Sequence, residues 1–167
     1  MDDTIPATDG RHILAAEGWL ELGNYSEAKE ELDEVSSSNL GHPDVLAVRW
    51  EIFSRARQWK ACEDVARALT AFRPEEARGW SQLAHSLHKQ RRTEEAYETL
   101  STVADVFPTS SSLFYNLAVY GCCLGKLDEA RSWLERAYET SSQSRQLKLL
   151  SRKDPALQNL WPTPGDE

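Results

Sequence analysis

The stretch WSQLAHSLHKQRRTEEAYETLSTVADVFP, residues 80–108, decides the fold of this 167-residue chain. Small and apolar residues recur in it three and four positions apart, the spacing that brings side chains to one face of a helix. They form two stripes: Trp80, Leu83, Ala84 and Leu87, then Ala96, Leu100 and Val103. A polar run separates the stripes, and Thr93 at its end can cap a helix whose first turn holds Glu94 and Glu95. The stretch therefore predicts two short antiparallel helices.

The same chemistry returns every 34 residues along most of the chain. One series of positions is small and a second is apolar: Ala28, Cys62, Ala96 and Ala130, and Leu32, Ala66, Leu100 and Leu134. The period defines four windows, residues 9–42, 43–76, 77–110 and 111–144. A fixed period of this length predicts stacked helix pairs, because each pair needs its neighbour to bury its apolar face. Small residues at the crossing let two helices approach to roughly 8–10 Å.

These windows resemble the tetratricopeptide repeat family, and bacterial members of it in particular. The third window matches the family pattern at Trp80, Leu83, Ala84, Ala96 and Pro108, and the fourth at Phe114, Leu117, Ala118, Gly125, Ala130 and Ala137. The resemblance covers about residues 9 to 144. It implies an all-α fold, a right-handed superhelix (α-solenoid) of antiparallel helix pairs.

The second window departs most from the pattern. Trp50 stands where a small residue is usual, and Ala66 stands where an aromatic is usual. We interpret this as an exchange of volume inside the stack, which is tolerated at modest cost. The alternative is an exposed Trp50 that contacts a partner, but burial is the commoner fate of a large aromatic side chain.

Charge and composition exclude several classes of function. A net charge of -8 disfavours nucleic-acid binding, which relies on a basic surface. No apolar run approaches about 18 residues, so no membrane span is expected. The start, Met1 to Thr4, is acidic where a signal peptide is basic, and three cysteines, two of them adjacent, predict no disulfide framework. We therefore expect a cytoplasmic protein.

Both ends lie outside the repeat. Residues 1–8 lack periodicity and are expected to form a flexible arm. Residues 145–167 are expected to hold a capping helix and a tail, because a stack must end in an element that is apolar inward and polar outward. Asp154 and Pro155 predict the start of a further short helical turn. Leu160 and Trp161 would pin that turn to the stack or, alternatively, dock another chain.

In the family, the first helix of each window lines a concave groove, which implies where a partner would bind. Carried over to this chain, the candidate partner-binding residues are Ile13, Glu17, Leu20, Glu51, Arg78, His85, His88, Tyr115 and Asn116. The acidic first half suits a basic or amphipathic segment, and a peptide of mixed charge would find a preferred direction along the groove. The alternative is a solvated groove whose polar residues only keep the scaffold soluble. The clamp by which some members grip a terminal carboxylate is absent, since Glu17 and Glu51 would repel it.

No catalytic constellation or phosphate loop accompanies these residues, so we expect neither an enzyme nor a cofactor. His85 and His88 have a spacing that can hold a metal, yet two histidines on one helix are more often ordinary surface residues, and no metal site is predicted. The favoured function is a protein-binding adaptor or scaffold, as a monomer or weak homodimer, with a protein or peptide partner. The alternatives are a small secretion chaperone and an oligomeric structural subunit.

Overall fold

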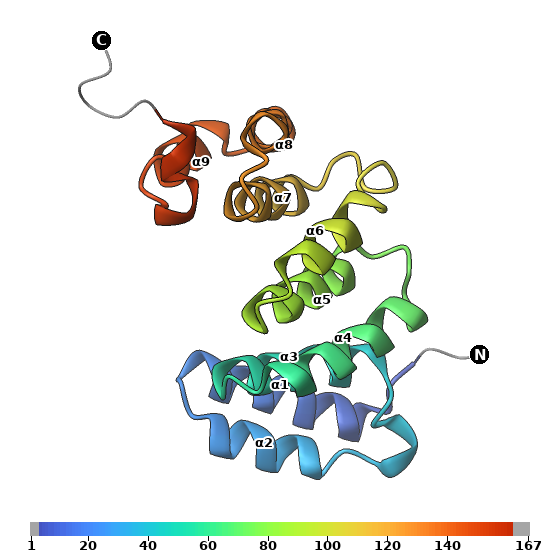
Figure 1. The fold of residues 1–167 in the computed structure, drawn as a ribbon. Helices are drawn as coiled ribbons and strands as arrows, with labels where there is room; N and C mark the ends of the chain where they lie inside the picture. The colour runs from blue at the N-terminus through green and yellow to red at the C-terminus, as the bar shows by residue number, and fades with distance from the viewer. Residues whose placement is uncertain (1–3, 162–167) are drawn as a thin grey trace. The chain divides into compact units, whose positions relative to one another are not determined.

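The computed structural model describes residues 4–161, whose course is shown in Figure 1. This part of the chain is helical and contains no strand. Its elements are α1 (Ala7–Glu21), α2 (Tyr25–Asp33), η1 (Ser37–Asn39), α3 (Pro43–Arg55), α4 (Trp59–Phe72), α5 (Ala77–Lys89), α6 (Thr93–Ser101), α7 (Ser111–Cys123), α8 (Leu127–Thr140), α9 (Ser144–Ser151) and η2 (Pro155–Leu160). From α1 to α8, successive pairs of α-helices follow the four 34-residue windows, with α1 beginning at Ala7, just before the first window. The expected all-α fold of helix pairs is confirmed.

The chain forms two compact units, which divide inside α5. Unit 1 extends to Ser86, and unit 2 begins at Leu87. In unit 1, helices α1, α2 and α3 share an apolar core of Ile13, Ala16, Ala28, Leu32, Val35, Val45, Val48 and Ile52. Ala16 and Ala28 are completely buried, as expected for small residues that let helices pack closely.

The turn inside each helix pair repeats as regularly as the helices do. A residue with positive φ stands at Gly23 (76°), Arg57 (55°), Arg91 (65°) and Gly125 (74°), positions that are 34 residues apart. A left-handed residue just after a helix is a common way to end it, and glycine adopts that conformation most easily. The period therefore extends to the backbone geometry of the turns.

Close approach of two helices explains the glycine at position 121 of the fourth window. Gly121 lies on α7, beside Ala130 of α8. A Cβ atom built on it would lie 3.1 Å from the Cβ of Ala130 on α8, tighter than ordinary van der Waals contact. Glycine here lets α7 and α8 pack together.

The N-terminal segment differs from the expected flexible arm. Helix α1 begins at Ala7, Ile5 packs against the core of unit 1, and the Gly10 amide donates to the Pro6 carbonyl at 2.9 Å. The prediction of a flexible arm for residues 1–8 was therefore wrong over residues 5–8, because Ile5 packs on the core and α1 begins before the first window. Residues 1–3 lie outside the described part.

The C-terminal segment caps unit 2 through the expected short turn more than through the expected capping helix. Helix α9 buries only Ser151 and leaves Leu149 and Leu150 58% and 55% exposed. The turn η2 instead buries Leu157 and Leu160 against α7 and α8, with Asp154 capping its start by accepting from the Ala156 amide at 2.9 Å. The capping interpretation of Leu160 therefore holds, while residues 162–167 lie outside the described part.

Trp50 is buried, with 7% of its surface exposed. Its indole Nε1 donates to the Ser86 hydroxyl at 3.1 Å, and its ring meets His85 edge-on at a centroid distance of 6.0 Å. The expected burial of Trp50 is confirmed, and the alternative of an exposed partner contact at Trp50 is wrong.

Candidate functional site

The first helices of unit 1 enclose two adjoining hollows of about 390 and 400 Å³, which both include Glu17. We call them together the α1–α3 groove. Its lining comes from the start of the chain, α1, α3 and α5: Ile5, Gly10, Ile13, Leu14, Glu17, Leu20, Glu21, Asp44, Ala47, Glu51, Arg55 and Arg78. Helical spacing explains why these residues of α1 and of α3 line the groove, since side chains three and four positions apart lie on one face of a helix. No helix of the described residues is long and apolar enough to cross a membrane.

Five of the predicted partner-binding residues meet in this groove: Ile13, Glu17, Leu20, Glu51 and Arg78. Ile13 is buried and forms part of the floor, whereas Glu17 and Arg78 are exposed at the surface. The repeat position alone identified these residues.

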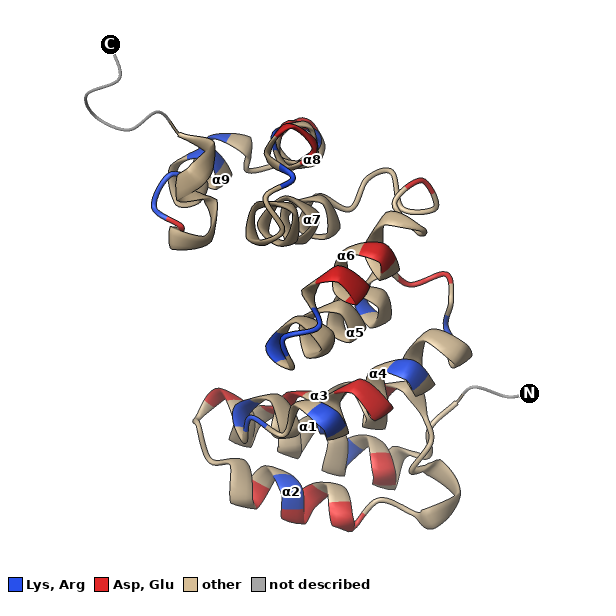
Figure 2. Ribbon diagram, in the orientation of Figure 1, with Lys and Arg blue, Asp and Glu red and all other residues tan. Residues whose placement is uncertain are grey.

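Carboxylates outnumber cations in the lining. Four acidic residues, Glu17, Glu21, Asp44 and Glu51, stand with two basic ones, Arg55 and Arg78. Figure 2 shows acidic and basic segments on the helices of this unit. Because the site is open to water, charges of this kind add little binding energy and can mainly set the direction of a charged ligand.

Apolar surface is available between the charges. Leu14 is 68% exposed although it lines the groove, and Leu20 is partly exposed. An exposed leucine beside a partly filled hollow can take an apolar anchor from a partner, and such anchors carry most binding energy in protein interfaces. The groove therefore has the chemistry to bind a positively charged segment with apolar side chains.

Sequence reasoning missed Ile5, Leu14, Glu21 and Arg55. Glu21 and Arg55 stand near the C-terminal ends of α1 and α3, beyond the positions that the family pattern assigns to the groove. Ile5 lies before the first window, so the period held no signal for it. A helical projection extended by one turn would have found Glu21 and Arg55.

The two predicted histidines take part in packing. The His85 ring meets Trp50 and Trp59 edge-on, at centroid distances of 6.0 and 5.8 Å. His88 Nδ1 lies 3.0 Å from the Thr93 hydroxyl, and its ring lies over Tyr120 with the centroids 4.8 Å apart. Burial lowers the pKa of His88, which favours its neutral form. Neither histidine lines the α1–α3 groove.

Tyr115 is engaged by the chain's own C-terminal segment. Its hydroxyl donates to Asp154 Oδ2 at 2.6 Å, and burial together with that hydrogen bond raises its pKa. The ring packs beside the core formed by Leu157 and Leu160. The Tyr115 hydroxyl is thus held by the chain's own C-terminal segment, and Asn116, half-buried on the same helix, lies outside the groove of unit 1.

Metal-ligating side chains do not gather in the described residues: no group of three or more histidines, cysteines or acidic residues there could hold an ion. Cys62 and Cys122 are buried, and burial raises the pKa of each thiol to about 11. Both thiols are therefore protonated near neutral pH and poorly nucleophilic.

Comparison with known proteins supports the fold. No protein-family model matches the chain. The chain is similar to the type IV pilus assembly protein PilF of Pseudomonas aeruginosa, with 25% identity over 128 residues, which are 75% of this chain and 51% of PilF. The chain thus spans about half the length of this curated relative.

Several solved structures are similar, and two of them illustrate the likeness. PilF of Pseudomonas aeruginosa matches with a TM-score of 0.71 and 21% identity, over 92% of this chain and 73% of that one. The crystal structure of MamA matches with a TM-score of 0.71 and 13% identity, over 84% and 82% of the two chains. Both neighbours are tetratricopeptide-repeat proteins, so the predicted repeat fold is confirmed.

Proposed function

We propose that this chain, a tetratricopeptide-repeat protein by fold, is a non-catalytic interaction module that holds a basic, amphipathic segment of a partner protein in the α1–α3 groove. One observation carries the proposal. Four carboxylates surround exposed leucine surface in hollows formed by successive first helices. Carboxylates there attract a cationic segment and set its direction, and Leu14 and Leu20 accept its apolar side chains.

The curated relative supports a role in assembly. PilF is named as a type IV pilus assembly protein, and this chain matches about half of it. By extension, the chain serves to bring together parts of a larger protein complex. The small secretion chaperone remains the second candidate, because a groove that holds an extended cationic segment would also hold an unfolded export substrate.

A binding titration tests the groove. The probe is a fluorescent peptide of alternating lysine and leucine, and the variant is Glu17→Gln with Glu51→Gln. Removing two carboxylates should weaken binding about tenfold at low salt, since each exposed charge pair contributes about 0.2–1 kcal/mol. The loss should shrink as salt rises.

The matched control is Glu30→Gln with Glu34→Gln, the same change of charge at exposed residues around α2. It should leave the affinity within about twofold, because these residues do not line the groove. Equal affinities for the groove variant and the wild type would refute the proposal.

A further inference from the structure

The segment that follows the last repeat is the most basic part of an acidic chain. Between Thr140 and Lys153 it contains four cations, Arg145, Lys148, Arg152 and Lys153, and no carboxylate, in a chain whose net charge is -8. Figure 2 shows this concentration on α9 and the turn after it. The repeat pattern gave these charges no function.

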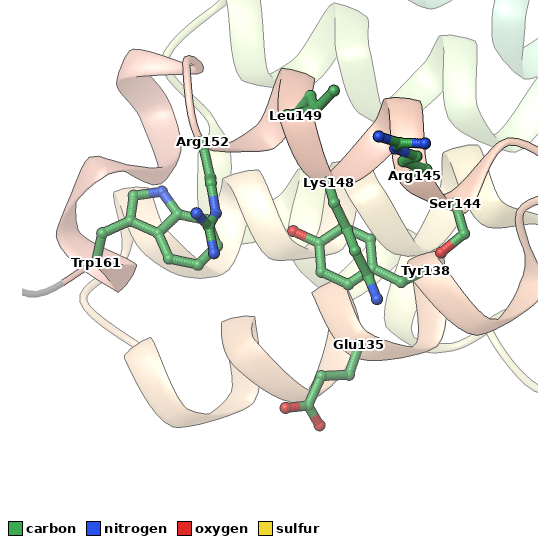
Figure 3. A pocket seen from close by; sticks show the side chains of 8 residues that line it. All are labelled: Glu135, Tyr138, Ser144, Arg145, Lys148, Leu149, Arg152 and Trp161. Carbon is green, nitrogen blue, oxygen red and sulfur yellow. The ribbon is translucent and has the colours of Figure 1, made fainter.

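Three of these cations line a hollow of about 780 Å³ in unit 2, drawn in Figure 3. Its lining consists of Arg145, Lys148, Arg152, Tyr138, Trp161, Leu149, Ser144 and Glu135. This volume is within the range of roughly 300–1,000 Å³ seen for ligand pockets. A second hollow, of about 460 Å³, shares the lining residues Ser144, Arg145 and Leu149 with the first and so adjoins it along α9. We call the larger hollow the α9 pocket.

Two aromatic rings lie beneath the cations. Lys148 Nζ lies 5.3 Å from the centre of the Tyr138 ring, and the Arg152 guanidinium carbon lies 5.9 Å from that of Trp161. The Ser151 hydroxyl donates to the Lys148 carbonyl at 3.0 Å, so the Tyr138 hydroxyl donates to Ser151 at 2.5 Å and ties α8 to α9. The Tyr138 ring is thereby held in place, and the Trp161 ring lines the same hollow.

Within the described part of the chain, the cations of the pocket have no carboxylate partner. Among residues 4–161, no acidic side chain lies within ion-pair distance of Arg145, Lys148 or Arg152. Among the described residues that line the hollow, Glu135 is the one acidic residue. Elsewhere in the molecule, many basic side chains pair with acidic ones, for example Lys126 with Glu94 at 2.9 Å.

We propose that the α9 pocket binds an acidic linear segment of a partner protein, with carboxylates on Arg145, Lys148 and Arg152 and an apolar side chain against Leu149 and the Tyr138 ring. Charge complementarity argues for this occupant, because unpaired cations around a hollow repel a basic segment and attract an acidic one. Leu149, 58% exposed, gains burial when the segment binds. The concave shape favours a peptide chain over a flat membrane surface. This site is separate from the α1–α3 groove and has the opposite charge preference.

The test is a fluorescence anisotropy titration of the full chain with a labelled peptide of glutamates and aspartates around one central leucine. The variant Arg145→Gln with Lys148→Gln should weaken binding about three- to tenfold at low salt. The matched control, Lys89→Gln with Arg91→Gln, makes the same change of charge at exposed residues of unit 2 and should keep the wild-type affinity. Glu17→Gln with Glu51→Gln should also leave this affinity unchanged, which separates the two sites.

Several outcomes would overturn the proposal. One is equal binding of the acidic peptide and its lysine counterpart, and another is unchanged affinity in the α9 variant. Sedimentation with phosphatidylglycerol vesicles that depends on Arg145 and Lys148, without binding of the peptide, would assign the surface to a membrane. A dimer that the α9 variant dissociates would assign it to a second copy. Circular dichroism of each variant checks that the helices remain folded.

Discussion

Asp9 shows how a single residue joins segments far apart in sequence. Its side chain is 2% exposed at the start of α1. It accepts from the Ser36 amide and hydroxyl at 3.3 and 3.0 Å and from Asn39 Nδ2 at 2.7 Å, so it ties α1 to the segment after α2. The Asn39 hydrogen bond is the largest cause of its lowered pKa, which burial partly opposes. The sequence pattern gave no indication of this link, because an aspartate in a first helical turn is ordinary.

Asp9 predicts a dependence of stability on pH. Since the folded state lowers its pKa, the ionised carboxylate stabilises the fold above the unfolded value of about 3.9, and this contribution is lost as pH falls through the folded pKa. The free energy of unfolding of wild type should exceed that of Asp9→Asn at pH 7, and the difference should shrink as pH falls below about 4. Urea unfolding over a pH series measures it. A difference that stays constant down to pH 2.5 would contradict this account.

Trp50 and Ser86 form a buried polar pair that predicts an energetic coupling. Ser86 is completely buried and accepts from the Trp50 indole while donating to the Gln82 carbonyl at 2.7 Å. Ser86→Ala leaves the indole N–H unpaired and should cost about 1–3 kcal/mol. After Trp50→Phe the same change should cost about 1 kcal/mol less, because the donor is already gone. Additive effects of the two changes in urea unfolding would show that the hydrogen bond contributes nothing.

At the scale of elements, one turn geometry serves all four helix pairs, with a left-handed residue every 34 positions. Gly23 and Gly125 adopt it easily, whereas Arg57 and Arg91 adopt it against the usual preference of side chains, since the left-handed region costs roughly 1–2 kcal/mol for an L residue. The surrounding helices therefore impose the turn.

Substitutions of two glycines in unit 1, Gly23 and Gly41, form a matched pair that tests the effect of the turn geometry on stability. Neither Gly23 nor Gly41 has an atom within 4 Å of an added Cβ, but only Gly23 has a positive φ, 76°. Gly23→Ala should therefore lower the free energy of unfolding by about 1 kcal/mol. Gly41→Ala should change it by less than about 0.5 kcal/mol. Equal effects of the two substitutions in chemical unfolding would remove backbone strain as the cause.

The helices and part of the groove lining could be predicted from sequence because both depend on local periodicity. Repeat position alone places Ile13, Glu17 and Leu20 on one face of α1. The fate of Tyr115 could not be predicted, because it depends on Asp154, 39 residues away and outside the repeat. The exposure of α9 could not be predicted for a related reason, because the turn that follows it, η2, supplies the side chains that cap α7 and α8.

At the scale of the whole molecule, the two units present surfaces of opposite character. Unit 1 has the acidic α1–α3 groove, and unit 2 has the basic α9 pocket. A net charge of -8 describes neither surface, since local charge decides which segment each one attracts. Under the two proposals, the chain would hold two partner segments of opposite charge at once, as suits a scaffold.

Hydrogen–deuterium exchange of the full chain, with and without a saturating lysine–leucine peptide, tests the central claim most directly. Amides that frequently open are protected when a ligand binds the closed form, so slowed exchange marks the elements around the site. The account predicts slower exchange in α1 and α3, Ala7–Glu21 and Pro43–Arg55, with α8 and α9 unchanged. Protection confined to unit 2, or none anywhere at saturation, would contradict it.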